Sequence, residues 1–141
     1  MAFLRLILLS FIVISCADSS PRPLSRSDLF SGQDKFGKTW QIQQIEIELG
    51  TLLPKSCVTD NFITYYPNGT YEINEGATKC NPEDLPGVIG QWYLDNEEDR
   101  LFIEIDDSLQ VWYIDETRSD YHKITSDFKE GNRTYTFSLS K

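Results

Sequence analysis

The sequence contains few residues that could act together in catalysis. It has one histidine, His122, and three cysteines, so a metal site or a nucleophile paired with a base would lack partners. We expect His122 to be a hydrogen-bonded residue in the core or at the rim of the fold. Alternating carboxylates at Asp95, Glu97 and Asp99 lack the glycine-pivoted spacing of a calcium loop, and we interpret them as a solvated turn. The sequence therefore predicts no catalytic residue, no metal ligand and no cofactor.

Cys16 is the residue whose surroundings indicate a chemical modification. Residues 1–15 contain one basic residue, Arg5, and an apolar run over 6–14 that is too short to span a bilayer. The run ends in Val13-Ile14-Ser15-Cys16, which resembles the bacterial lipobox, where a signal peptide is removed and acyl chains such as palmitate are attached to the cysteine. An ordinary secretory signal with a coincidental cysteine is the alternative. We predict a signal peptide over 1–15 and lipidation at Cys16.

The residue after Cys16 and the charge of the chain bear on location and partners. Ala17 is not the aspartate that retains lipoproteins at the inner membrane in enterobacteria, so we expect a lipid anchor in the outer membrane, facing the periplasm or the surface. Without Arg5 the chain keeps 12 of its 13 basic and all 22 acidic residues, a formal charge of about −10. This acidity argues against nucleic acid and against attraction to anionic headgroups. The acyl chains would then hold a monomer at the membrane.

The other two cysteines enclose a predicted hairpin. Two apolar-aromatic stretches between Cys57 and Cys80 flank Pro67-Asn68-Gly69, a tripeptide typical of turns. A three-residue loop would pair Tyr66 with Thr70, whereas a two-residue loop would shift the register by one. We prefer the first because one face then carries Ile63, Tyr65, Tyr71 and Ile73. Both registers bring Cys57 and Cys80 within one residue of each other across the ladder. In an oxidising compartment this predicts a Cys57–Cys80 disulfide.

The remaining chain divides into a tether and one β domain. Residues 16–37 are polar and interrupted by prolines, glycine and serines, which predicts a lipidated N-terminus and a flexible tether, with one helical turn at 28–30 as an option. About 20 such residues reach roughly 25 Å. Residues 38–141 alternate apolar and polar residues in eight short segments, with a bulge or bend at Gln43-Gln44. Eight antiparallel strands with short turns predict an all-β, up-and-down meander that closes into a small barrel.

The expected turns assign side chains to the two faces of this barrel. A three-residue turn at 106–108 would set Leu101, Ile103 and Ile105 opposite Tyr113, Val111 and Leu109. The turn at 95–99 brings Trp92 beside Ile103, and a four-residue turn at 129–132 brings Ile124 beside Phe137. The inner face is then apolar except at His122, which would lie beside Tyr113, and Ser126. The outer face carries a row formed by Tyr93, Phe102 and Trp112, with Lys123 next to it.

Several short motifs can be compared with a known family. They are Gly37 before Trp40, the Cys57…Asp60 pair, Pro67-Asn68-Gly69-Thr70, Cys80, Gly90-Gln91-Trp92 and the closing strands. With them, 38–141 resembles the lipocalin-like domain of small lipoproteins of Gram-negative bacteria. True lipocalins have one residue between that glycine and the tryptophan, whereas this chain has two. The resemblance implies a small lipocalin-like barrel, and it implies that the arginine stacked over Trp40 would be Arg133.

Two classes of function are compatible with these features. A lipid-anchored binding protein would hold a small apolar ligand in its barrel, against the inward residues Trp92, Tyr113, His122, Tyr135 and Phe137. An interaction or accessory module would contact an envelope protein or a glycan through the outer row Tyr93, Phe102 and Trp112. The first needs an interior cavity, and bulky inward residues argue against a large ligand. We place ligand binding first and expect no enzymatic activity.

Overall fold

The strands close into a barrel. The computed structural model describes residues 22–47, 50–52, 55–83, 87–105, 107–128 and 131–140. The proposed signal peptide and Cys16 lie outside these residues. The described elements are α1 (Arg26–Ser31), β1 (Lys38–Ile47), β2 (Gly50–Leu52), α2 (Ser56–Thr59), β3 (Phe62–Tyr65), β4 (Thr70–Asn74), β5 (Gly87–Leu94), β6 (Arg100–Ile105), β7 (Ser108–Thr117), β8 (Tyr121–Phe128) and β9 (Gly131–Leu139).

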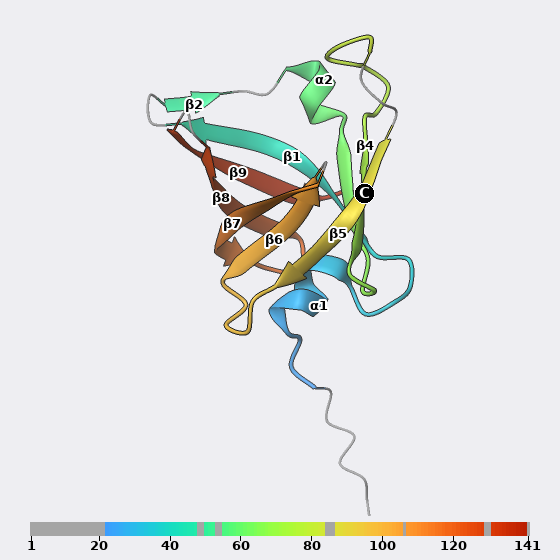
Figure 1. Ribbon diagram of the computed structural model, residues 1–141, viewed down its shortest axis with the longest axis vertical. Helices are drawn as coiled ribbons and strands as arrows, with labels where there is room; N and C mark the ends of the chain where they lie inside the picture. The colour runs from blue at the N-terminus through green and yellow to red at the C-terminus, as the bar shows by residue number, and fades with distance from the viewer. Residues whose placement is uncertain are drawn as a thin grey trace, which may run out of the picture.

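Strand β1 makes the closure. From β3 to β9 each strand pairs with the next, and β1 pairs with β3 over its first residues and with β9 along most of its length. The predicted eight-stranded antiparallel barrel is therefore confirmed, and β2 is a short additional strand beside the end of β1. In Figure 1 α1 lies at the lower end of the barrel and α2 at the upper end. We call these the α1 end and the α2 end.

Two local predictions are confirmed in detail. Tyr65 pairs with Tyr71 and Ile63 with Ile73, the register of the three-residue hairpin loop. Gly69 has a φ of 84°, and its N–H donates to the Tyr66 carbonyl at 3.1 Å, so glycine takes the left-handed position that the turn requires. The ladder of β1 with β9 also shifts register between Ile42 and Gln44, which is the expected bulge.

The β6–β7 register differs from the expected one by a single residue. Leu101 pairs with Trp112 and Ile105 with Ser108, so the strands are joined by two residues and not by three. The second of these, Asp107, has a φ of 60°, a conformation that aspartate adopts more readily than most residues. Because side chains alternate along a strand, a shift of one residue exchanges the faces of β7. The expected orientations of Trp112 and Tyr113 were therefore wrong.

The β8–β9 register differs by two residues. Ile124 pairs with Tyr135, and His122 pairs with Phe137, where we expected Ile124 beside Phe137. The ladder continues to Phe128 and Gly131, so the connection is two residues shorter than expected. A shift of two residues keeps every side chain on its own face. His122, Ile124 and Phe137 are accordingly buried, as the expected inner face required.

Helix α1 contains the helical turn that we expected as an option at 28–30, and it makes residues 25–32 part of the fold and not of a flexible tether. The Ser25 hydroxyl accepts from the Asp28 N–H at 3.0 Å, and the Asp28 carboxylate accepts from the Ser25 N–H at 3.0 Å, which is a capping box. The helix places Phe30 in the core, with no exposed surface. The folded unit therefore begins at the cap of α1, because the helix closes one end of the barrel.

The disulfide is confirmed, although Cys57 does not lie in a strand. Cys57 and Cys80 are bonded, with their Cα atoms 5.0 Å apart. Cys57 belongs to α2, and Cys80 follows the end of β4 by several residues. The bond thus links the segments that precede and follow the β3–β4 hairpin at the α2 end.

Candidate functional site

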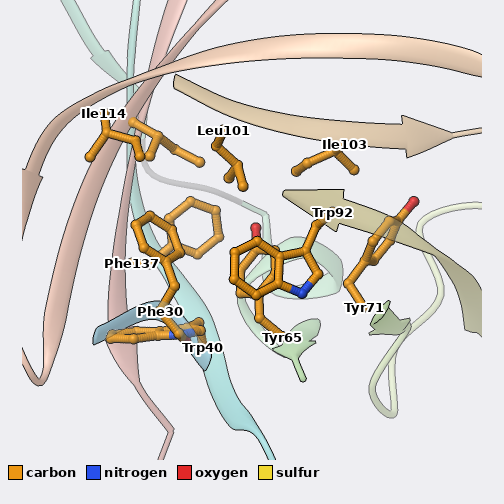
Figure 2. Close-up of a cluster of buried hydrophobic side chains, with 10 residues drawn as sticks. Phe30, Trp40, Tyr65, Tyr71, Trp92, Leu101, Ile103, Ile114 and Phe137 are labelled. Carbon is orange, nitrogen blue, oxygen red and sulfur yellow. The ribbon is translucent and has the colours of Figure 1, made fainter. Parts of the chain in front are cut away.

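The interior near the α1 end is filled by aromatic rings. Tyr65 and Trp92 contact each other edge to face, with ring centroids 5.3 Å apart, and Phe30 lies 5.7 Å from Tyr65. The Trp40 indole N–H donates to the Phe30 carbonyl at 2.8 Å. Figure 2 shows this cluster, to which Tyr71, Leu101, Ile103, Ile114, Ile124 and Phe137 also belong. These rings leave the α1 end of the barrel tightly packed.

His122 is enclosed by this cluster. Its ring centroid lies 4.3 Å from that of Trp40 and 4.6 Å from those of Phe30 and Phe137. It is fully buried, and neither ring nitrogen has a hydrogen-bond partner among the described residues. Burial, together with the positive charge of Lys38, lowers the pKa of His122 to about 3. His122 is therefore a neutral core residue. Contrary to our expectation, it makes no hydrogen bond to the described residues and does not lie beside Tyr113.

The inner face toward the α2 end is packed less completely. Six apolar side chains on inner-face positions contact the core but keep part of their surface exposed: Ile42, Ile63, Ile73, Ile105, Trp112 and Tyr135. They come from six different strands, so they surround the interior. Inward-pointing apolar side chains with remaining accessible surface are what an apolar ligand would cover. We call these six residues the inner apolar wall.

Trp112 and Tyr135 form the aromatic part of the inner apolar wall. Their rings stack with centroids 5.2 Å apart and an interplanar angle of 27°. The indole N–H of Trp112 donates to the Gln110 side-chain oxygen at 3.2 Å, which adds a polar group at an inner position of β7. Trp112 thus lies inside the barrel, and the outer row that we expected loses this member.

The structure separates the predicted ligand-binding residues into three groups. Trp92, His122 and Phe137 are buried in the packed cluster and show almost no accessible surface. Tyr135 lies on the inner apolar wall. Tyr113 points outward with 51% of its surface exposed, because of the β6–β7 register. The isoleucines of the wall were not proposed as site residues, although Ile105 was expected on the inner face and Ile63 and Ile73 were expected to share one face.

The outer face of β5, β6 and β7 carries an apolar surface. Tyr93 and Phe102, two members of the expected outer row, pair across the strands and stack with centroids 4.7 Å apart. Val111 is the next residue in the row, where we expected Trp112. Tyr93 is 50% exposed. We call the surface formed by Ile89, Tyr93, Phe102, Leu109, Val111 and Tyr113 the outer patch.

An open groove adjoins the outer patch. The ladder between β5 and β6 ends at the Trp92–Ile103 pair, and the two strands diverge toward the α2 end (Figure 1). The Tyr71 hydroxyl donates to the Glu104 carbonyl at 2.7 Å where the ladder has ended. The groove has a volume of about 480 Å³ and is lined by Val88, Ile89, Gly90, Gln91, Glu104 and Asp107.

A lysine occupies the place that we assigned to Arg133. The Lys38 ammonium lies 5.4 Å from the centre of the Trp40 ring and donates to the carbonyl oxygens of Leu29 and Ser119 at 3.0 and 2.8 Å. Arg133 pairs with Ile47, at the opposite end of β1 from Trp40. The expectation that Arg133 stacks on Trp40 was therefore wrong.

Two features are absent from the part of the chain that the structure describes. No group of histidine, cysteine, aspartate and glutamate side chains there has the arrangement of a metal site. No helix there is long and apolar enough to cross a membrane.

The comparison with solved structures identifies the fold. A crystal structure of a lipocalin-like protein from Bacteroides uniformis matches with a TM-score of 0.53 and 13% sequence identity, over 72% of this chain and 94% of that chain. No protein-family model matches the sequence, and no curated protein does. At this identity the match describes the fold alone. The chain has a lipocalin-like β-barrel fold, as the sequence motifs implied.

Proposed function

We propose that this chain is a lipid-anchored lipoprotein of the outer membrane whose barrel binds a small apolar ligand at its α2 end. The inner apolar wall is the observation that supports ligand binding. Covering its six partly exposed side chains would remove apolar surface from water, which is the main source of affinity for such a ligand. The tight packing around His122 leaves the α2 end as the binding region, and we propose no enzymatic activity.

The proposed anchor rests on the lipobox at Cys16. The disulfide supports it, because Cys57 and Cys80 pair with each other and Cys16 is then the cysteine left for lipid. Cys16→Ala should move the protein from the membrane fraction to the soluble fraction while leaving its melting temperature unchanged. A variant that stays with the membrane would contradict the anchor.

Binding can be tested with N-phenyl-1-naphthylamine, an apolar probe that fluoresces when it leaves water. The wild type should bind it saturably. Ile73→Phe adds volume on the inner apolar wall and should weaken binding several-fold. Leu109→Phe is the matched control, because Leu109 lies on the outer face with 55% of its surface exposed. Equal binding by the wild type and Ile73→Phe, with both proteins folded, would exclude the barrel interior as the site.

The outer patch favours a second candidate function, the docking of an envelope protein. Four of its residues, Ile89, Tyr93, Leu109 and Tyr113, are each at least 50% exposed. Apolar surface gathered on one face in this way is typical of interaction sites. Carboxylates of Glu104, Asp107 and Asp115 lie among or beside these residues and are exposed. A partner that presents basic residues around an apolar surface would complement this face.

This second function predicts a cross-linked complex in intact cells that depends on the outer patch. Tyr93→Ser should abolish the complex and lower the melting temperature only slightly, because it removes one half-exposed ring that stacks on Phe102. Glu104→Lys should weaken the complex through charge repulsion. Asn68→Ser, in the exposed turn at the α1 end, is the control. A complex that survives both changes on the outer patch would contradict docking at this face.

A further inference from the structure

Helix α1 fixes the point at which the chain enters the barrel. The Glu98 carboxylate accepts from the backbone N–H groups of Arg26 and Ser27, at 2.8 and 3.4 Å, and the Arg26 guanidinium donates to the Glu98 carbonyl. On the other side Lys38 donates to the carbonyl of Leu29. These contacts join the start of α1 to the turn between β5 and β6 and its end to β1, so the N-terminal segment leaves from the α1 end.

The sequence between Cys16 and this point is short. Eight residues lie between Cys16 and Ser25, the cap of α1, and the chain that joins the two spans at most about 32 Å when fully extended. The ten residues of β1 run about 33 Å, which at the usual strand tilt is about 25 Å along the barrel axis. Only an almost fully extended linker would therefore let the α2 end touch a membrane that holds Cys16. In less extended arrangements the α1 end, from which the linker leaves, is the end of the barrel nearer to the membrane.

Two apolar side chains project from the α1 end. Phe36 is 73% exposed and Leu24 is 51% exposed. The Lys35 ammonium lies 5.3 Å from the centre of the Phe36 ring. The Phe36 N–H donates to the Asp34 carboxylate at 2.9 Å. The next residue, Gly37, has a φ of 72° and packs so closely that a Cβ would lie 2.5 Å from the Tyr65 carbonyl oxygen. An exposed phenylalanine on a fixed loop, with a lysine beside it, matches the side chains that peripheral proteins place at the membrane interface.

We infer that the α1 end is a membrane-contact surface, on which Phe36 and Leu24 enter the boundary between headgroups and acyl chains and Lys35 lies at the level of the phosphates. The inference rests on the proposed anchor at Cys16, which holds the surface close to lipid. Asp34 lies on the same loop, and Asp28 and Glu98 lie nearby. The contact is therefore apolar in origin and requires no anionic lipid.

This orientation determines how a ligand reaches the barrel. The inner apolar wall lies toward the α2 end, which then faces away from the bilayer. A ligand enters from the aqueous side and does not slide into the barrel from the membrane to which the protein is attached. The protein would exchange ligand with soluble carriers or with a facing membrane.

The test attaches the protein chemically to lipid, so that it does not depend on native lipidation. The chain from Cys16 onward, with its disulfide intact, is coupled through the Cys16 thiol to a maleimide lipid in phosphatidylcholine vesicles. Half of the preparations contain phosphatidylcholine brominated at acyl carbons 6 and 7, which quenches tryptophan that enters the bilayer. Phe36→Trp should show a blue-shifted emission and a greater loss of emission in brominated vesicles than the wild type.

Ile89→Trp is the matched control, because Ile89 is 78% exposed on β5 and far from α1. Its loss of emission should equal that of the wild type, which reports the background of Trp40, Trp92 and Trp112. Equal quenching of Phe36→Trp and the wild type, in protein that floats with the vesicles, would overturn the inference. Greater quenching of Ile89→Trp would overturn it as well and would assign the contact to the other end. The anchor itself is tested separately, by the fractionation of Cys16→Ala. If the native protein lacks lipid, that experiment contradicts the anchor, whereas the quenching experiment tests only the membrane contact.

Discussion

Trp40 donates its indole N–H to the carbonyl oxygen of Phe30, and both side chains are fully buried. The first strand of the barrel thereby binds the helix that closes it. This hydrogen bond is shielded from water, so breaking it without replacement leaves a buried donor unpaired. The pair makes α1 a part of the fold.

Phe30→Ala should therefore destabilise the protein strongly. Removing a buried phenylalanine costs about 3–5 kcal/mol, because the transfer energy is lost and a cavity remains. Phe36→Ala is the control, since Phe36 is mostly exposed and its loss should cost less than about 0.5 kcal/mol. Urea unfolding of both variants measures the difference. Equal stabilities would mean that α1 does not pack as described.

The stability of the protein should fall between pH 7 and pH 5 because of His122. Burial lowers the pKa of His122 to about 3, whereas an unfolded histidine titrates near 6.5. Between these values the unfolded chain binds a proton that the folded chain does not. The contribution of His122 is therefore complete above pH 6.5 and is lost as the pH falls toward 3. Linkage gives a loss of about 2 kcal/mol from pH 7 to pH 5.

His122→Phe tests this assignment. Phenylalanine has a similar shape, suits the aromatic surroundings and removes two ring nitrogens that lack partners among the described residues. The variant should be at least as stable as the wild type at pH 7 and lose much less stability at pH 5. Urea unfolding at both pH values gives the comparison, and an unchanged pH dependence would assign the effect to carboxylates.

Two neighbouring residues on β7 should respond very differently to truncation. Trp112 lies on the inner apolar wall and stacks on Tyr135, so Trp112→Ala should cost about 3 kcal/mol. Tyr113 is exposed on the outer patch, so Tyr113→Ala should change stability by less than about 0.5 kcal/mol. Thermal melts of the two variants test the β6–β7 register. The opposite order would restore the three-residue turn.

The Cys57–Cys80 bond should stabilise the fold appreciably. It closes a loop with a sequence separation of 23 residues, and limiting the unfolded chain in this way contributes roughly 3 kcal/mol. The double variant Cys57→Ala, Cys80→Ala should melt at a lower temperature than Cys16→Ala, which keeps the bond. Intact mass after alkylation without reductant should show no reactive thiol in Cys16→Ala. Two reactive thiols would contradict the disulfide.

The accuracy of the sequence predictions followed the strength of the turn signals. Pro67-Asn68-Gly69 permits few backbone conformations, and its hairpin was predicted in the correct register. The acidic stretch before Ser108 carries no glycine that would indicate the length of the turn. In the structure Asp107 takes the positive φ of this turn. One residue of error there exchanged the roles of Trp112 and Tyr113.

Helix α1 was expected only as an optional helical turn at 28–30, and its packing into the barrel was missed for a different physical reason. Prolines and serines around it indicated a tether, and a six-residue helix has little intrinsic stability. The signal that could have found it is Ser25 followed by Asp28 just before Leu29 and Phe30, which is a capping box before an apolar pair. Its burial depends on Trp40, Lys38 and Glu98, and no local pattern in the sequence shows that these residues would gather around it.

The pairing of β1 with β9 has a consequence for how the barrel folds. Trp40 pairs with Leu139, so the ladder that completes the barrel joins the two ends of the domain. Contacts between such distant residues form late and slowly, since the intervening chain must be ordered first. A polypeptide that is synthesised from its N-terminus has to wait for its last strand. Until then β1 and β8 are open edges, and during that interval the protein is most exposed to aggregation and to chaperones that bind unpaired strands.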